Sequence, residues 1–122
     1  MSVESYLKDG VDLRNLAPQW AIGYPIIQHC FHVRGYSCVV TNGNERTPEQ
    51  LAAKPNTLHP SGKALDFRTK QVPMTEKLAL MTVIRESLGP QWDVVLEHLG
   101  KAHEHCHIEY QPKDASGKPV EV

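Results

Sequence analysis

The sequence predicts a single α+β domain in which a small antiparallel β-sheet has two main helices packed on one side. Two stretches place apolar residues at helical spacing, and four short stretches are rich in β-branched and aromatic residues. The 122 residues are enough for one domain around one hydrophobic core. We expect this domain to occupy residues 1–110, followed by a polar tail over residues 111–122.

Helices are expected in two places. Residues 17–34 carry an apolar stripe that includes Val33, and Gly35 is a typical residue to end such a helix. Residues 75–88 carry a second stripe that includes Leu78, and a Gly-Pro pair follows it.

Strands are expected in four places, and the last two form a hairpin through a connection at residues 98–102. Residues 44–58 are polar, contain two prolines and form a long loop, which in a compact domain is often functional. The expected strands are YSCVVT (36–41), ALDFR (64–68), WDVVLE (92–97) and HEHCHIEY (103–110).

Composition excludes several classes of protein. Lys and Arg total 13 against 14 Asp and Glu, so no basic field predicts a nucleic-acid partner. Apolar runs fall short of the ~20 residues that span a bilayer, and no signal peptide is recognisable, so we expect synthesis in the cytoplasm without export by such a signal. The three cysteines have no metal-type spacing and are expected to be buried or free thiols.

Histidines are concentrated in the predicted hairpin, where four of the seven fall within ten residues. Strand alternation puts His103, His105, His107 and Glu109 on one face, and the expected hairpin register brings Glu97 opposite His103. Burying such a face without water would cost several kcal/mol per unpaired charge. The pattern therefore predicts a water-lined groove or a metal site.

The stretch TLHPSGKALDFRT (57–69) supplies two further polar groups. Asp66 points away from the apolar neighbours of its strand, and the turn after His59 could fold that imidazole back beside it. His59, Asp66 and one hairpin histidine would give zinc three protein ligands and leave a fourth position open, as in catalytic sites. Arg68 is expected to pair with a neighbouring acid.

The same stretch resembles the (Ser/Thr)-x-His-x-x-Gly-x-Ala-x-Asp signature of the zinc D-alanyl-D-alanine carboxypeptidases, and HCHIEY is similar to their closing His-x-His strand. That superfamily includes vancomycin-resistance dipeptidases, phage endolysins and the Hedgehog signalling domain. The resemblance covers most of the chain, because YSCVVTNGNE and WDVVLE are similar to the strands before the first and last ligands. It implies a Hedgehog/D-Ala-D-Ala peptidase-like fold.

The resemblance also implies roles for individual residues. His59, Asp66 and His107 would bind one Zn²⁺ per chain. Thr57 would assist substrate binding, and Arg46 in the upstream loop would polarise the substrate. The implied substrate is a peptidoglycan stem peptide or cross-bridge, and short members of this shape are common in phage genomes.

Three residues are candidates for the catalytic base. Carboxypeptidase-like members use the first histidine of His-x-His, here His105, whereas dipeptidase-like members use an acid three residues before the final ligand, here Glu104. Alternation favours His105 because it shares a face with His107, although a β-bulge would reverse that choice. Glu97 is similar to an acid in Hedgehog-like members, and its other interpretation is a charged strand end near solvent.

We therefore expect a zinc metallopeptidase, a hydrolase of peptidoglycan peptides with endolysin-like or carboxypeptidase activity, acting at the bacterial cell wall alone or as part of a virion. Zinc lowers the pKa of bound water to about 7, and a nearby base takes and returns the proton. One alternative is a non-catalytic zinc-binding module of a virion or partner-binding protein. Another is a metal-free structural protein whose histidine face meets solvent or a partner subunit.

Overall fold

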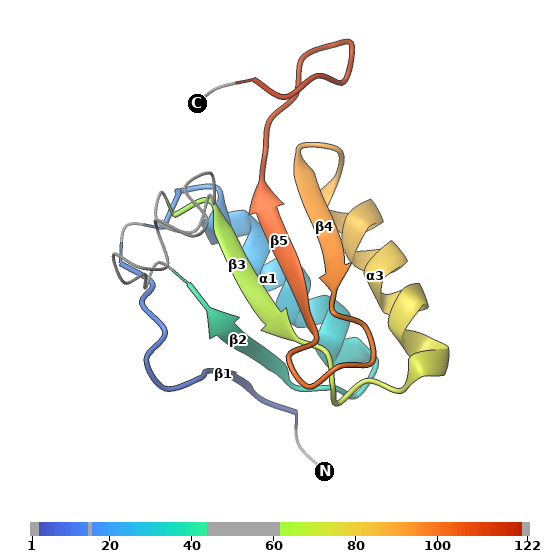
Figure 1. Cartoon of the computed structure of the whole chain (residues 1–122). Helices are drawn as coiled ribbons and strands as arrows, with labels where there is room; N and C mark the ends of the chain where they lie inside the picture. Colours follow the sequence, from blue (N-terminus) through green and yellow to red (C-terminus); the bar gives the residue numbers. More distant parts are fainter. Residues whose placement is uncertain (1–2, 15, 44–61, 121–122) are drawn as a thin grey trace.

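The computed structural model describes residues 3–14, 16–43 and 62–120. Within these ranges the chain has an α+β fold with a five-stranded mixed sheet and two helices (Figure 1). The strand order is β1-β2-β3-β5-β4. The elements are β1 (Ser5–Leu7), α1 (Trp20–Val33), β2 (Cys38–Asn42), β3 (Ala64–Arg68), α3 (Met74–Leu88), β4 (Trp92–Glu97) and β5 (His105–Tyr110).

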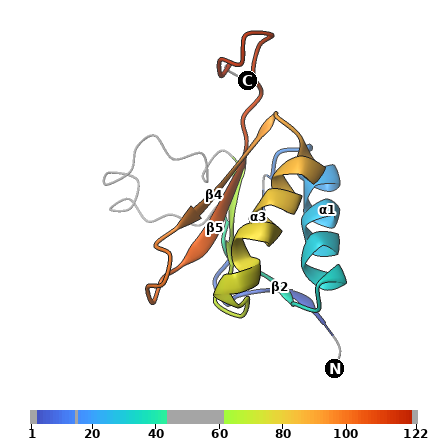
Figure 2. The ribbon, with the colours of Figure 1, turned by 90° about the vertical axis from the view of Figure 1, so that its right-hand side faces the viewer.

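Both helices lie on one side of the sheet and pack against each other (Figure 2). The strand side chains that face them, such as Leu65, Phe67 and Ile108, are fully buried. They form one hydrophobic core with Phe31 of α1 and Ile84 of α3. The predicted α+β class is confirmed, and alternation along the strands leaves the opposite sheet face for polar side chains.

The four predicted strands pair antiparallel, but a fifth, unpredicted strand makes the sheet mixed. β1 pairs in parallel with β2, while the other pairs are antiparallel. The chain passes through α1 between these two strands, and such a helical crossover joins strands that run in the same direction. The sequence does not predict β1, because three residues are too few to show a strand period.

The end of α1 agrees with the sequence. Gly35 has φ of 87°, a left-handed conformation that glycine adopts without strain at the end of a helix. Val33 lies in the last turn and is 67% exposed, so its predicted place in the buried stripe is wrong. Earlier in the helix, a Cβ at Gly23 would lie 2.5 Å from the ring of Trp92, and glycine therefore lets β4 approach α1 closely.

The buried face of α3 differs from the predicted one. Leu78 is 61% exposed, whereas Lys77 is only 5% exposed. Lys77, Leu80, Met81 and Ile84 follow one helix face at the expected spacing, and Leu78 is turned about 100° away from Lys77. A charged side chain therefore enters the interior from this helix.

β4 and β5 form the predicted hairpin, but in a different register. Glu97 pairs with His105 rather than with His103, and the connection takes residues 98–104 instead of 98–102. The longer connection accommodates two successive backbone turns, closed by Lys101 N–H to His98 carbonyl at 2.9 Å and Glu104 N–H to Lys101 carbonyl at 3.2 Å. A shift of two residues keeps Glu97 on the histidine face.

Cys30, Cys38 and Cys106 are buried free thiols, as predicted. Burial raises the pKa of Cys38 to about 12 and raises that of Cys106 further, so neither is poised as a thiolate. Among the described residues, no helix has the length and apolar character needed to cross a membrane.

Residues 111–120 continue past the end of β5 (Figure 1). Gln111 N–H donates to Gln91 carbonyl at 2.8 Å, and Lys113 Nζ lies 2.9 Å from Asp93 Oδ1. These bonds attach the first part of the polar segment to β4 and to the residue before it. The division of the chain at residue 110 stays a prediction.

Candidate metal centre

The candidate site lies on the sheet face opposite the helices. β3 pairs with β5 so that Asp66 opposes His107 and Arg68 opposes His105. From the other side of β5, Glu97 of β4 also opposes His105. Directly paired residues point to the same face. The sheet register therefore brings carboxylates of two strands and imidazoles of a third onto one surface.

Asp66 and His107 are in direct contact on this surface. His107 Nδ1 lies 2.9 Å from Asp66 Oδ1, and its Nε2 lies 2.8 Å from Glu109 Oε1. Burial lowers the pKa of His107, but the hydrogen bonds to these two carboxylates outweigh burial and raise it to about 9. Asp66 is 6% exposed, and Asn42 Nδ2 donates to its second oxygen at 3.2 Å.

His105 joins Asp66 to Glu97. Its Nε2 lies 3.0 Å from Glu97 Oε1 and 3.7 Å from Asp66 Oδ2. Its Nδ1 lies 2.9 Å from the backbone carbonyl of His103. Because a carbonyl only accepts, Nδ1 carries a proton, and the contact fixes the ring with Nε2 toward the carboxylates.

The donor set fits a metal ion. One oxygen of Asp66, one of Glu97 and one nitrogen of His105 all lie within 4.8 Å of one another. Zinc takes imidazole nitrogen and carboxylate oxygen at about 2.0–2.2 Å, which puts two ligand atoms of a tetrahedral site roughly 3.3 Å apart. The Asp66 contacts with His107, at 2.9 Å, and with His105, at 3.7 Å, bracket that separation. Asp66 can thus share a cation with His105 and Glu97, whereas His107, which contacts Asp66 and Glu109, is not among these converging ligand atoms of the described residues.

The carboxylate of Glu104 is directed to the interior side of the hairpin. It is 5% exposed, and both of its oxygens accept from Lys77 Nζ, at 2.8 and 2.6 Å. Thr69 Oγ1 and the Gly100 N–H, at 2.9 Å, also donate to it. Burial raises the pKa of Glu104, but the hydrogen bonds from Lys77 and Thr69 outweigh burial and lower it. Its carboxylate is ionised and committed to these four donor contacts.

A cavity of about 290 Å³ adjoins Asp66 and His105. Its walls come from β2, β3, the start of β5, the 98–104 connection and the residues just after β1 and β3, so segments far apart in sequence meet there. Arg68 does not pair with an acid among the described residues, contrary to expectation, and instead donates to the hydroxyl of Tyr6 at 3.3 Å. The lining residues are Lys8, Thr41, Asn42, Asp66, Arg68, Lys70, Ala102, His103, Glu104 and His105.

Two loop histidines lie at this cavity: His103 lines it, and His98 contacts His103. The rings of His98 and His103 lie 4.0 Å apart, and the rings of His98 and His105 lie 5.7 Å apart. Repulsion from His98 is the main cause that lowers the pKa of His103. Neither loop histidine belongs to the group of metal-ligating atoms found in the described part of the chain.

His59, Thr57 and Arg46 lie outside the described residues, so their predicted roles stay predictions. Of the remaining predicted site residues, Asp66, His107, His105 and Glu97 meet on the polar face. Glu104 is directed into the interior instead.

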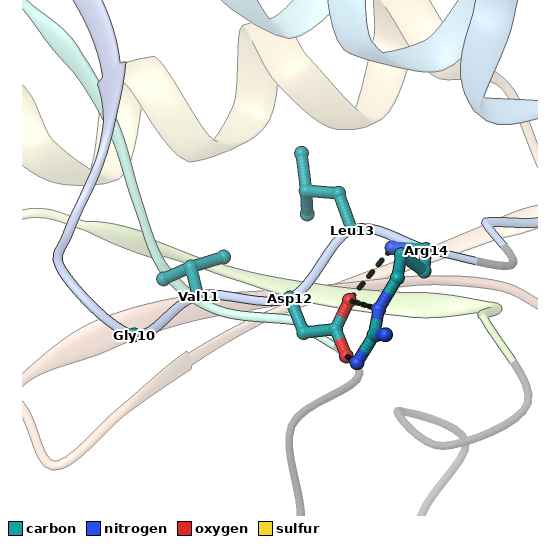
Figure 3. Close-up of a pocket in the computed structure, with 5 residues that line it drawn as sticks. All are labelled: Gly10, Val11, Asp12, Leu13 and Arg14. Carbon is teal, nitrogen blue, oxygen red and sulfur yellow. Dashed lines mark hydrogen bonds and ion pairs between the residues drawn. The ribbon is translucent and has the colours of Figure 1, made fainter.

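A second, shallow pocket of about 750 Å³ is lined by residues 10–14, ahead of α1 (Figure 3). Its two charged side chains bind each other, with Arg14 Nη2 2.8 Å from Asp12 Oδ2 and Arg14 Nε 3.0 Å from Asp12 Oδ1 (Figure 3). The hydrogen bond from Arg14 lowers the pKa of Asp12 to about 2. This pocket offers a matched ion pair rather than a set of converging ligand groups.

Two residues of the site region are not predicted from sequence. Asn42 meets Asp66 because β2 pairs with β3, and its only sequence signal is its place at the end of a strand. Lys77 meets Glu104 across 27 residues, and its signal is a charge at a position where the helical stripe expects an apolar residue.

The fold and the site together define an α+β protein with a candidate metal-binding face. No protein-family model matches the sequence, and neither a curated protein nor a solved structure matches the chain.

Proposed function

We propose that the chain is a zinc-dependent peptidase that hydrolyses peptidoglycan stem peptides or cross-bridges. The observation that carries this proposal is the position of Asp66 between two histidines on a sheet face that no described helix covers. The resemblance of residues 57–69 and 105–110 to the zinc D-alanyl-D-alanine peptidases supports zinc as the metal and the cell wall, reached in phage infection, as the place of action.

Under this proposal His59, Asp66 and His107 hold the zinc ion, which supplies Lewis acidity at the scissile carbonyl. His105 is the general base that takes a proton from the attacking water and returns it to the leaving amine. Its Nδ1 bond to the backbone fixes the ring, and Glu97 accepts from Nε2 once that atom is protonated. Arg46 and Thr57 bind the substrate.

A specific observation favours a second candidate, a non-catalytic zinc-binding module. Glu97 and His105 offer ligand atoms close to Asp66, and His107 contacts the same carboxylate. If all four side chains bind one cation, the site is closed and leaves no position for water.

Metal analysis combined with digestion of defined muropeptides tests the two candidates. The peptidase requires about one zinc per chain and release of a new amine from the muropeptide, detected by mass spectrometry. His105→Gln should abolish release while zinc remains bound. Bound zinc with no product from any muropeptide would favour the closed module, and absence of zinc binding would contradict both.

A further inference from the structure

The ring nitrogen Nε2 of His105 faces two carboxylates. It lies 3.0 Å from Glu97 Oε1 and 3.7 Å from Asp66 Oδ2. Because Nδ1 of this ring donates to the His103 carbonyl, Nε2 of the neutral ring carries a lone pair. Three acceptor atoms then face one another with no hydrogen between them. Such an arrangement is stabilised by a cation at the point where the three atoms converge.

This point is separate from the contact between Asp66 and His107. Asp66 Oδ1 lies 2.9 Å from His107 Nδ1, whereas its Oδ2 is the oxygen nearer His105. The ligand atoms of Asp66, Glu97 and His105 lie within 4.8 Å of one another, and His107 does not belong to this group in the described part of the chain. One carboxylate can bind a different cation through each oxygen, as in sites where two metal ions lie ~3.5–4 Å apart.

We infer that Asp66, Glu97 and His105 form a second zinc site, weaker than the proposed catalytic site, with which it shares Asp66. The consequence of filling it rests on the proposed peptidase function. A zinc ion on Nε2 occupies the lone pair with which His105 takes a proton from the attacking water. Excess zinc therefore inhibits the enzyme that the first zinc ion activates.

The distances and exposure suit a zinc ion. Two ligand atoms of a tetrahedral zinc site lie roughly 3.3 Å apart, and the two distances from His105 Nε2 bracket that value. The side chain of Glu97 is 39% exposed, so water can complete the coordination. Asn42 Nδ2 also donates to Asp66 Oδ2, at 3.2 Å, and a carboxylate oxygen has a further lone pair for a cation.

Two features make the second ion bind more weakly than the first. Two divalent ions that share the carboxylate of Asp66 repel each other. Lys8, Arg68 and Lys70 line the cavity next to His105, and their positive charge opposes the entry of a cation. The second ion should therefore bind after the first, at a higher concentration of free zinc.

The test titrates zinc, at buffered free concentrations, into the metal-free, ¹⁵N-labelled protein. Metal analysis after equilibrium dialysis should give two binding steps and two zinc ions per chain at saturation. Long-range ¹H–¹⁵N spectra of the imidazoles should show a shift of His105 Nε2 in the second step. Hydrolysis of defined muropeptides, followed by mass spectrometry, should rise over the first step and fall on the order of 10²-fold or more over the second, because the base is blocked.

Glu97→Gln removes one ligand of the second site while keeping the size of the side chain. It should weaken the second step by at least the ~10–100-fold that loss of a ligand's hydrogen-bond partner costs, and should leave the first step in place. Inhibition is expressed for each variant as the ratio of its rates before and after the second step, so a changed basal rate does not affect the comparison. If a melting curve shows that Glu97→Gln fails to fold, Glu97→Asp, which shortens the side chain but keeps its charge, replaces it and should show a smaller loss.

Two control variants make the result specific. Asp93→Asn removes the same charge from the same face of β4, four residues from Glu97 and outside the group of converging ligand atoms, and should leave both steps unchanged. His98→Asn tests the neighbouring pair of loop histidines, whose rings lie 4.0 Å apart. His98 has φ of 56°, which asparagine tolerates, and the second step should persist in this variant.

The outcomes separate the second site from the proposed function. Saturation at one zinc ion per chain, or a second step that Glu97→Gln leaves unchanged, overturns the second site. Loss of the second step in His98→Asn but not in Glu97→Gln places the ion on the loop histidines and also overturns it. A rate that stays constant or rises over the second step keeps the peptidase and overturns the inhibition. Two zinc ions, the second dependent on Glu97, with no hydrolysis at any zinc concentration would support the second site and count against the peptidase.

Discussion

Replacing Lys77 with methionine should destabilise the protein strongly, because it leaves the buried carboxylate of Glu104 without its cation. Lys77 and Glu104 are each 5% exposed, and the ammonium contacts both carboxylate oxygens. Removing one partner of a buried ion pair typically costs ~3–5 kcal/mol. For a domain of this size, that loss corresponds to a fall in melting temperature on the order of 10–20 °C.

The predicted loss depends on pH in a defined direction. The folded-state pKa of Glu104 is lowered from its ordinary value of 4.5, since the bonds from Lys77 and Thr69 outweigh the effect of burial. A lowered pKa contributes stability that is present above the unfolded-state pKa and is lost as pH falls through the folded-state pKa. The difference between wild type and Lys77→Met should therefore be largest near neutral pH and shrink below about pH 4.5.

Urea unfolding of wild type, Lys77→Met, Glu104→Gln and the double variant measures this effect. The double variant should be less destabilised than Lys77→Met, because a neutral amide costs less to bury than an unpaired carboxylate. Lys101→Met is the matched control and should change stability by no more than about 0.5 kcal/mol, since its lysine is exposed. A loss below about 1 kcal/mol in Lys77→Met, or a double variant worse than both single variants, would refute the reasoning.

Three further predictions concern the metal site and the core. The pKa of His107 is about 9, so at pH 7.5 its ring is protonated in the metal-free protein, and zinc binding should release about one proton from it. Calorimetry in buffers of different ionisation enthalpy should detect this proton. If His107→Gln releases the same proton, His107 is not its source. His107→Ala should lose both zinc and activity. His105→Ala should keep zinc and a near-native melting curve, while its kcat falls by ~10²–10⁴-fold. Loss of zinc from both variants would indicate a closed site. Gly23→Ala should lower the free energy of unfolding by ~1–3 kcal/mol, because the added Cβ would lie 2.5 Å from the Trp92 ring. A melting temperature equal to that of wild type would show that the ring moves aside without cost.

The sequence predicts the bounds of two of the three strands that bear the site, whereas β5 begins two residues later than predicted. ALDFR and WDVVLE are found as β3 and β4 at the predicted residues, because alternation and β-branched content are local properties of each strand. β1 has no such signal, and its parallel pairing depends on how α1 returns the chain to the sheet. Pairing partners are set by tertiary structure rather than by local pattern.

The polar face is predicted more reliably than the register that builds it. Glu97 opposes His105 rather than His103, an error of two residues that leaves Glu97 on its predicted face. The error arises in the connection, where two consecutive turns and a bond from Gly100 to Glu104 lengthen the loop. The bond from Gly100 to Glu104 depends on where Lys77 holds the Glu104 carboxylate. A local sequence pattern does not predict that position.

The helical period of α3 bears directly on the choice of catalytic base. Leu80, Met81 and Ile84 define a buried face that extends back to position 77, where the sequence has lysine instead of an apolar residue. A lysine at such a position needs a buried carboxylate, because leaving its charge unpaired would cost several kcal/mol. Glu104 supplies that carboxylate. If its side chain moved to the polar face, the buried ammonium of Lys77 would be left unpaired. The energetic cost of that movement favours His105, oriented by Glu97, as the proposed base.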